Sequence, residues 1–215
     1  MIIILLGPPG AGKGTQARLL QEKFDLEYFG SGQMLRNRIK TRDFTGKKID
    51  EVMNQGKKVS APIVIDLWMD KFEEIKNNNS KGIIIDGSPR SGMEAEIMTE
   101  VLAWYEWDKN VSPIFINLSE QEANDRLLKR RVCVKCKKNI PYIGKYKTME
   151  KCDECGGELI KREDDEPEDI KNRFKWYKTD VLPAVEYYKK QGILIEINGE
   201  QSIKDVHKEI MNKLK

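Results

Sequence analysis

The chain alternates short apolar runs with segments whose apolar residues recur at helical spacing. The apolar runs predict buried strands over residues 2–6, 26–29, 82–86, 112–118 and 193–197. The helical spacing predicts helices over residues 16–24, 63–75, 94–107, 120–131, 166–191 and 202–214, and Pro183 is expected to kink one of them. Because strands that alternate with helices form a parallel sheet covered on both faces, this pattern predicts an α/β fold.

A polar segment over residues 39–58 interrupts the alternation. It offers only Phe44, Ile49, Val52 and Met53 for burial, which is too little for a core of its own. We therefore expect a small, mobile helical flap in this segment.

Three large or titratable side chains need a separate interpretation. Trp104 and Trp107 lie near the end of one predicted helix, where we expect them to pack against the sheet; an exposed contact patch is the alternative. The single histidine, His207, is expected at the surface, so histidine-based acid–base chemistry is not expected.

The first predicted strand is followed by Gly7-Pro8-Pro9-Gly10-Ala11-Gly12-Lys13-Gly14-Thr15 and then by a predicted helix. This order is typical of a phosphate-binding loop, because glycines let successive backbone N–H groups face an anion. The helix N-terminus adds partial positive charge, and Lys13 is placed to reach the outer phosphates. The loop departs from the strict pattern at Gly14, since the expected hydroxyl arrives one residue later, at Thr15. A plain Gly/Pro turn is the alternative.

Composition and charge limit the class of protein. The 215 residues suffice for one sizeable domain with small insertions. Charged residues make up 34% of the chain but the formal net charge is only +3, which argues against a general nucleic-acid binder. No apolar run reaches the length of a membrane span, and Met1 leads into the first strand without a signal-peptide pattern. We therefore expect a cytoplasmic protein with no membrane or nucleic-acid partner.

All four cysteines lie in one segment, as Cys133-x-x-Cys136 and Cys152-x-x-Cys155. This spacing is typical of a tetrahedral zinc site built from two knuckles. Because four thiolates leave no open coordination position, the metal is expected to be structural. A four-cysteine ribbon alone would also suit nucleic-acid binding, but its location in a nucleotide-binding chain favours a clamp over the nucleotide. Four free thiols are the alternative.

Further motifs follow in a specific order along the chain. They are Met34-Leu35-Arg36, Asp86-Gly87-x-Pro89-Arg90, the arginines of residues 126–131, Arg162-Glu163-Asp164-Asp165, and Arg173. With the glycine loop and the cysteines, they make the chain resemble adenylate kinases of the long, zinc-lid type from end to end. The resemblance implies a P-loop NTPase fold, in which helices flank a five-stranded parallel sheet. It also implies a core of residues 1–29, 60–128 and 166–215, a helical NMP-binding flap of residues 30–59, and a zinc-ribbon lid of residues 129–165.

The resemblance implies reversible, magnesium-dependent phosphoryl transfer from ATP to AMP, giving two ADP. Such transfer requires two phosphates held in line and their charge neutralised, and the chain supplies many cations and no obvious general base. The residues that the resemblance implies for catalysis are Lys13, Arg36, Arg90, Arg130, Arg162 and Arg173. Those implied for ATP binding are Gly10, Ala11, Gly12, Lys13, Gly14, Thr15, Arg126, Arg130 and Gln201.

The same resemblance implies an acceptor site and two metal sites. The residues implied for AMP binding are Ser31, Arg36, Lys57, Lys58, Val59, Gly87, Arg90, Glu94, Arg162 and Arg173. Thr15 and Asp86 are implied for Mg²⁺, in part through water. Zn²⁺ is implied at Cys133, Cys136, Cys152 and Cys155.

The departures from the usual adenylate kinase pattern lie on the acceptor side. Ser31-Gly32-Gln33 replaces the usual Thr-Gly-Asp, and Ser88 replaces a phenylalanine. Glu94 replaces the glutamine that reads the acceptor base. A carboxylate only accepts hydrogen bonds, so it suits the two adjacent donors of guanine better than the edge of adenine. We favour AMP with reduced discrimination, and we predict that Glu94→Gln raises the preference for AMP over GMP.

Other functions stay open from the sequence. One is a nucleoside monophosphate kinase that acts on GMP, UMP or CMP. Another is an ATPase that binds nucleic acid through the zinc ribbon, and a third is a nucleotide-binding module without catalysis. A monomer is the default oligomeric state.

Overall fold

The computed structural model describes residues 1–55, 57–162 and 165–214. Five parallel strands form the central sheet in the order β2-β3-β1-β4-β8. They are β1 (Ile2–Leu6), β2 (Glu27–Gly30), β3 (Ile83–Asp86), β4 (Val111–Asn117) and β8 (Ile195–Asn198). Isoleucine-rich strands buried on both faces are typical of parallel sheets, and the predicted α/β fold is confirmed.

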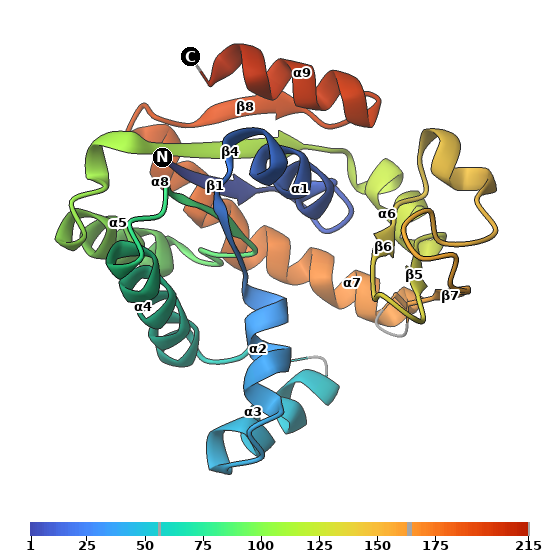
Figure 1. Cartoon of the computed structure of the whole chain (residues 1–215), viewed down its shortest axis with the longest axis horizontal. Helices are drawn as coiled ribbons and strands as arrows, with labels where there is room; N and C mark the ends of the chain where they lie inside the picture. The colour runs from blue at the N-terminus through green and yellow to red at the C-terminus, as the bar shows by residue number, and fades with distance from the viewer. Residues whose placement is uncertain (56, 163–164, 215) are drawn as a thin grey trace.

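Helices cover both faces of the sheet (Figure 1). On one face, α1 (Lys13–Phe24) and α9 (Ile203–Lys213) pack over the side chains of Ile3 and Leu5. On the other face, α4 (Ala61–Asn77), α5 (Gly92–Trp104) and α8 (Leu182–Lys190) pack over Ile2, Ile4 and Leu6. The alternation of side chains along β1 therefore supplies both halves of the core.

The polar segment forms two helices, α2 (Ser31–Ile39) and α3 (Phe44–Asn54), which project from the sheet at its lower edge in Figure 1. Leu35 and Ile49 join the main core, whereas the Phe44 side chain is 84% exposed. The helical structure of this segment is confirmed, whereas its role as a flap and its mobility stay predictions.

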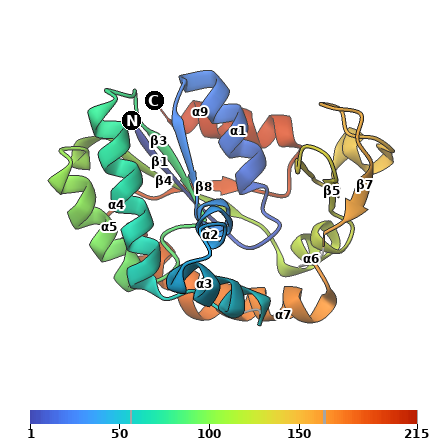
Figure 2. The same ribbon diagram turned by 60° about the horizontal axis from the view of Figure 1, so that its bottom comes forward.

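The cysteine segment forms a separate three-stranded antiparallel sheet in the order β6-β5-β7. Its strands are β5 (Arg131–Cys133), β6 (Asn139–Ile140) and β7 (Leu159–Lys161), and the short helix η2 (Gly144–Thr148) lies between β6 and β7. Helix α6 (Glu120–Leu128) leads into this sheet, and α7 (Pro167–Trp176) leads out of it. Figure 2 shows the ribbon beside α6, on the side of the molecule opposite α4 and α5.

The long predicted helix over residues 166–191 is interrupted before the proline rather than at it. The wide turn η3 (Tyr177–Val181) is π-helical and joins α7 to α8. Pro183 lacks an N–H and its ring crowds the carbonyl of Thr179, which lies inside η3. The proline thus accounts for an interruption that begins several residues upstream of it.

The two tryptophans differ. Trp107 stacks on Tyr105 and meets the edge of Phe72, as expected for core packing. Trp104 is 82% exposed, so the expectation of burial is wrong for this residue. The final turn of α5 points it away from the sheet, and the helix η1 (Asp108–Asn110) follows. Within the described residues, no helix combines the length and the apolar character needed to cross a bilayer.

Candidate active site

The glycine loop lies between β1 and α1, in the strand–loop–helix order that the sequence predicts. Gly12 has φ +89°, in the left-handed region that favours glycine, and it immediately precedes the helix. A Cβ on Gly7 would lie 2.5 Å from the carbonyl oxygen of Ile116, so only glycine fits at this point. These constraints turn the chain sharply and leave the N-terminus of α1 facing the loop.

Lys13 is the first residue of α1, and its ammonium group turns back over the loop. Its Nζ donates to the carbonyl oxygens of Gly7 at 2.8 Å and Pro8 at 2.9 Å. Burial lowers the pKa of Lys13 to about 8. The Lys13 ammonium group has therefore lost part of its solvation by water. An anion bound at the same place would compensate for that loss.

Several charged groups from distant segments surround Lys13. The Asp86 carboxylate at the end of β3 opposes the lowering of the Lys13 pKa. The positive charges of Arg173, Arg90 and Arg130 lower that pKa further. The fold thus brings four of the predicted catalytic cations within electrostatic reach of one another. Asp86 is the carboxylate that acts on Lys13, and a group of cations of this kind suits a polyanionic ligand.

Asp86 lies beside the start of α1. Its Oδ2 accepts a hydrogen bond from the Tyr28 hydroxyl at 3.1 Å, and a Cβ on Gly14 would lie 3.4 Å from the same oxygen. Burial raises the pKa of Asp86, whereas Lys13 and Tyr28 oppose the shift. Thr15 follows Gly14 directly, so a carboxylate and a hydroxyl are available next to the loop. Hard oxygen donors of this kind fit Mg²⁺.

Arg90 is held in a compact set of hydrogen bonds on the acceptor side. Its Nε donates to the Gly87 carbonyl at 2.7 Å, and its Nη2 donates to Ser31 Oγ at 2.8 Å. Ser31 in turn donates to the Gly87 carbonyl at 2.7 Å. Burial lowers the pKa of Arg90, and the carboxylates of Glu94 and Asp86 oppose the shift. Three residues predicted for the acceptor site are therefore in mutual contact.

Arg36 lies on α2, and its Nη2 approaches Gln33 Oε1 at 3.4 Å. Burial raises the pKa of Tyr28, and the positive charge of Arg36 is among the groups that oppose this shift. Arg36 therefore faces the part of the site that contains the Tyr28–Asp86 pair. Of the segment after the flap, Lys57 is exposed and Val59 is buried in the main core.

Glu94 is fully buried in the first turn of α5. Its Oε2 accepts a hydrogen bond from the backbone N–H of Arg90 at 2.7 Å, while its own N–H donates to Ser91 Oγ at 3.1 Å. This pattern resembles a capping box, except that the carboxylate accepts from the residue before the N-cap Ser91 rather than from Ser91 itself. The Lys58 Nζ lies 3.5 Å from the other carboxylate oxygen, Oε1. Glu94 is therefore part of the local structure as well as a candidate for contact with the base.

Arg130 of the predicted lid and Arg173 of α7 share one carboxylate. Arg130 binds Asp165 through two bonds, Nε to Oδ2 at 2.7 Å and Nη2 to Oδ1 at 2.6 Å. Arg173 donates from Nη1 to Asp165 Oδ1 at 2.9 Å. Asp165 is fully buried, so both guanidiniums are oriented by a charge that water does not screen. Arg162 donates to Asn139 within the ribbon, at 3.4 Å.

The residues predicted for the donor base lie near the β8–α9 connection. The Arg126 side chain is mostly buried and donates to Glu122 Oε1 at 2.7 Å and to the Gly199 carbonyl at 3.1 Å. These contacts bring Arg126 against the segment that contains Gln201. The Gln201 amide donates to Glu209 Oε2 at 2.6 Å, which orients it toward α9.

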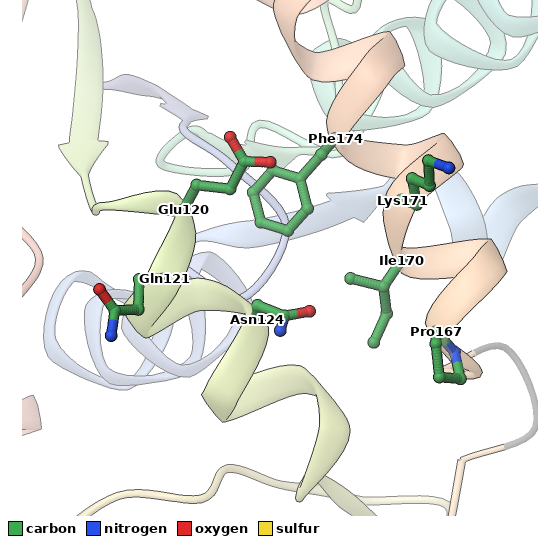
Figure 3. Close-up of a pocket in the computed structure, with 7 residues that line it drawn as sticks. All are labelled: Glu120, Gln121, Asn124, Pro167, Ile170, Lys171 and Phe174. Carbon is green, nitrogen blue, oxygen red and sulfur yellow. The ribbon is translucent and has the colours of Figure 1, made fainter.

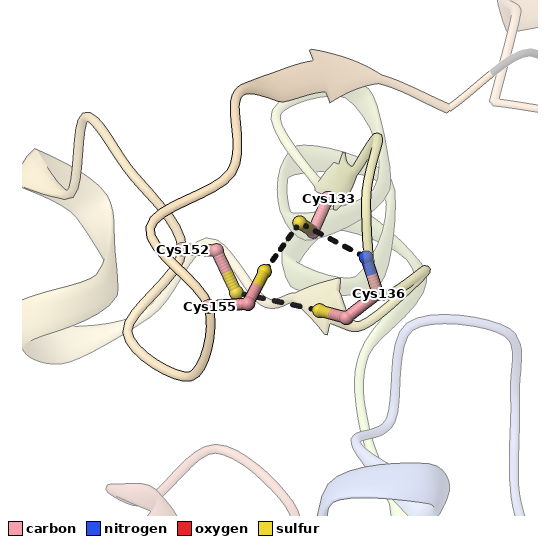
Figure 4. A group of neighbouring side chains, drawn as sticks. All are labelled: Cys133, Cys136, Cys152 and Cys155. Carbon is pink, nitrogen blue, oxygen red and sulfur yellow. Dashed lines mark hydrogen bonds between the residues drawn. The ribbon is translucent and has the colours of Figure 1, made fainter.

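The four cysteine sulfur atoms form one cluster (Figure 4) and lie within 4.8 Å of one another. The Cys133 and Cys155 sulfurs are 3.4 Å apart, and those of Cys136 and Cys152 are 3.5 Å apart. Four sulfurs bound to a tetrahedral zinc at about 2.3 Å would lie about 3.8 Å from one another. The cluster therefore fits a structural Zn²⁺. A Cβ on Gly157 would lie 2.8 Å from the Cys133 sulfur, which explains the small residue at this turn.

Comparison with known proteins gives one consistent result. The sequence model of the family described as "Adenylate kinase" matches residues 5–193. A protein named adenylate kinase from Archaeoglobus fulgidus is 37% identical over 212 residues, 98% of this chain and 96% of the relative. Proteins of the same name from Caldicellulosiruptor bescii and Petrotoga mobilis are each 36% identical, over 100% of this chain and 99% and 98% of their own lengths.

This chain belongs to the adenylate kinase family. Adenylate kinases are nucleoside monophosphate kinases, so the class of enzyme inferred from the sequence is confirmed. The comparisons do not favour the nucleic-acid-binding ATPase or the non-catalytic module. The adenylate kinase fold, with its five-stranded parallel sheet, is also confirmed.

The structure brings some of the predicted adenylate kinase site residues together more closely than others. Asp86, Arg90, Arg130 and Arg173 each act electrostatically on Lys13. Arg162 donates instead to Asn139 of the ribbon, and Gln201 donates to Glu209 of α9. Glu163 and Asp164, part of the motif that carried the resemblance, lie outside the described residues.

Asp165 is the site residue for which the sequence analysis assigned no role. It ends the motif Arg162-Glu163-Asp164-Asp165, yet its contacts reach 35 residues back to Arg130 and eight forward to Arg173. Asp165 is one of four consecutive acidic residues, 163–166, and nothing local in the sequence indicates which of them pairs with the arginines. The available signal was the set of arginines predicted to converge on one site, because cations brought together in this way need an anion among them.

A pocket of about 290 Å³ lies between α6 and α7, outside this cluster (Figure 3). It is lined by Glu120, Gln121, Asn124, Pro167, Ile170, Lys171 and Phe174. None of the predicted nucleotide-binding residues lines it, so the cluster of cations, rather than this pocket, is the candidate active site of this adenylate kinase.

Proposed function

We propose that this protein transfers the terminal phosphoryl group of ATP to AMP in a reversible reaction that yields two ADP. Membership of the adenylate kinase family supports the reaction. The single structural observation that carries the proposal is the convergence of Asp86, Arg90, Arg130 and Arg173 on Lys13. Two polyanions repel each other, and cations that arrive from the loop, the acceptor side and the lid would neutralise that repulsion from several directions.

We assign the donor phosphates to the loop of residues 7–15 and to Lys13. Backbone N–H groups at the start of α1 would bind the phosphate oxygens, with Lys13 as a point charge between them. Arg130 would approach the same phosphates from the lid. Arg126 would stack on the donor base, close to the backbone of residues 198–201, and Gln201 is the candidate for a polar contact there.

We assign the acceptor phosphate to Arg36 and Arg90. The planar guanidinium binds phosphate oxygens in pairs, and the contacts of Arg90 with Gly87 and Ser31 hold it in one orientation. Arg162 and Arg173 would bridge the donor and acceptor phosphates. Lys57, Lys58, Val59 and Glu94 would surround the acceptor base and ribose.

Asp165 has a distinct role in this scheme, because it contacts two of these arginines rather than a phosphate. By fixing the planes of Arg130 and Arg173, it would reduce the reorganisation needed when the phosphates arrive. We therefore assign Asp165 as a positioning residue.

Two metals complete the proposal. Thr15 and Asp86 would hold Mg²⁺, in part through water, and the ion would neutralise phosphate charge. The four cysteines would hold Zn²⁺ as a structural ion in the lid. Residues 30–59 would act as the acceptor flap and residues 129–165 as the lid, and their closure would exclude water that could otherwise take the phosphoryl group. The cytoplasmic location and the monomeric state stay predictions.

The direct test is an assay of diphosphate formation from ATP with AMP, GMP, CMP and UMP in the presence of Mg²⁺. We expect AMP to be the best acceptor. No diphosphate with any of the four would contradict the proposal. Metal analysis of the same sample should give about one zinc per chain, and a Cys136→Ser variant should lose it.

A further inference from the structure

The acceptor side contains a charge pair between Lys58 and Glu94. Glu94 is fully buried at the start of α5, and Lys58, which lies just before α4, is 28% exposed in its side chain. The distance from Lys58 Nζ to Glu94 Oε1 is 3.5 Å. A lysine in this position supplies a hydrogen-bond donor next to a side chain that can only accept.

The two oxygens of Glu94 differ in their contacts. Oε2 accepts a short hydrogen bond, 2.7 Å, from the backbone N–H of Arg90. Oε1 is buried and has no hydrogen-bond partner among the described residues. At 3.5 Å the Lys58 ammonium neutralises its charge without forming a close hydrogen bond. A buried acceptor without a hydrogen bond lowers the stability of the protein unless a ligand group donates to it.

This asymmetry bears on which base the site accepts. A carboxylate recognises guanine best with both oxygens, because the ring N–H and the exocyclic amine of guanine are adjacent donors. In Glu94 one oxygen is already committed to Arg90, so only Oε1 is available for a base. The preference for guanine that a carboxylate has in isolation is therefore reduced here by the structure around it.

We infer that Lys58 and Glu94 together read the acceptor base, as a donor–acceptor pair that replaces a single carboxamide. Glu94 Oε1 accepts from the exocyclic amine of adenine, and the Lys58 ammonium donates to the adjacent ring nitrogen. This inference rests on the proposed function and names Lys58 as a specificity-determining residue for it. Because cytosine carries the same amine and ring nitrogen in the same order, the pair separates AMP and CMP from GMP and UMP.

A double-mutant cycle tests the inference. The value of kcat/KM for AMP and for GMP is measured for the wild type, Lys58→Met, Glu94→Gln and the double variant, at saturating ATP and Mg²⁺. Lys58→Met should lower kcat/KM for AMP about tenfold, mainly through KM, and should leave the value for GMP within about twofold. In the presence of Glu94→Gln, where the amide supplies its own donor, removal of Lys58 should change the AMP value less than about twofold.

Lys47→Met is the matched control, since it removes an exposed lysine of α3 and changes the net charge equally. Lys58→Arg should keep the AMP to GMP ratio of kcat/KM within about threefold of the wild type. This variant also tests the inference if Lys58→Met does not fold. Equal losses for AMP and GMP in Lys58→Met, or an equal loss with and without Glu94→Gln, would overturn the inference and leave Lys58 as a structural counter-charge. A wild type that forms no ADP from ATP and AMP would instead contradict the proposed function.

Discussion

Two buried carboxylates, one in the lid and one on the acceptor side, have opposite surroundings. Asp165 uses both oxygens in three bonds of 2.6–2.9 Å to Arg130 and Arg173. Glu94 uses one oxygen for a backbone N–H and leaves the other without a hydrogen-bond partner among the described residues. Both side chains are fully buried, so the difference does not arise from exposure to solvent.

The comparison shows how one kind of group serves two purposes. A fully bonded buried carboxylate fixes its partners and has no capacity left for a ligand. A partly bonded one retains an acceptor that a ligand can use, at a cost to the stability of the protein. On this basis we propose that Asp165 sets the geometry of phosphoryl transfer, whereas Glu94 helps to choose the acceptor.

The largest effect is expected from Asp165→Asn. Removal of the charge leaves two guanidiniums without their shared anion, so their orientation is lost and the free energy of unfolding falls as well. We expect kcat to fall about 100-fold, with KM for AMP within about threefold of the wild type. Steady-state kinetics measure both, and thermal unfolding confirms that the variant is folded at the assay temperature.

Glu168→Gln is the control for this variant, because it removes an exposed carboxylate from the first turn of α7. It should leave kcat within about twofold. A folded Asp165→Asn variant with unchanged kcat would show that Asp165 does not position the arginines for catalysis.

The next effect concerns Lys13, which carries a buried positive charge where Asp165 and Glu94 carry negative ones. Its pKa is lowered from 10.5 to about 8, mainly by burial, so Lys13 loses its proton as the pH rises through that value. We expect kcat/KM for ATP to fall about tenfold between pH 7 and pH 9, because only the cationic form binds phosphate well. The folded chain then binds fewer protons than the unfolded chain between about pH 8 and 10.5, so this group adds stability as the pH rises.

A pH series at fixed free Mg²⁺ measures this dependence. Bound phosphate favours the charged form of Lys13, so kcat should stay constant to a higher pH than kcat/KM does. A value of kcat/KM for ATP that is constant to pH 9.5 would contradict the electrostatic account of the loop.

The cluster around Lys13 also shows what sequence alone can predict. The strands, the loop and the cysteine pairs are encoded by residues close together in the chain. The parallel sheet, the strand–loop–helix order and the clustering of the four cysteines are confirmed. Lys58 and Glu94, or Arg130 and Asp165, lie 36 and 35 residues apart, and no local pattern indicates their contact. Trp104 is a similar case, since its exposure depends on where α5 ends relative to the sheet.

A smaller effect is expected from Glu94→Gln. The amide offers guanine a weaker acceptor than a carboxylate and gains a donor for adenine, so the AMP to GMP ratio of kcat/KM should rise about threefold. Glu96→Gln, an exposed substitution on the same helix, should leave the ratio unchanged. An unchanged ratio in Glu94→Gln as well would mean that this side chain does not contact the base.

The smallest effect is expected at an exposed ion pair that joins the ribbon to α1. Arg18 Nη1 lies 3.1 Å from Glu154 Oε1, with side chains 42% and 51% exposed. Water screens such a pair, so Arg18→Met should change the free energy of unfolding by less than about 0.5 kcal/mol. Urea denaturation measures this change. A loss of stability well above about 1 kcal/mol would contradict the view that water screens this ion pair.

The most direct test of the central claim measures Asp165→Asn and Glu94→Gln in one assay of ADP formation, with AMP and GMP as acceptors. The account predicts that the two variants separate: Asp165→Asn lowers kcat for both acceptors equally and leaves their ratio unchanged, and Glu94→Gln shifts the ratio and leaves kcat for AMP within about twofold. The account is contradicted if both variants lower kcat by similar factors, or if Asp165→Asn changes the ratio of the two acceptors.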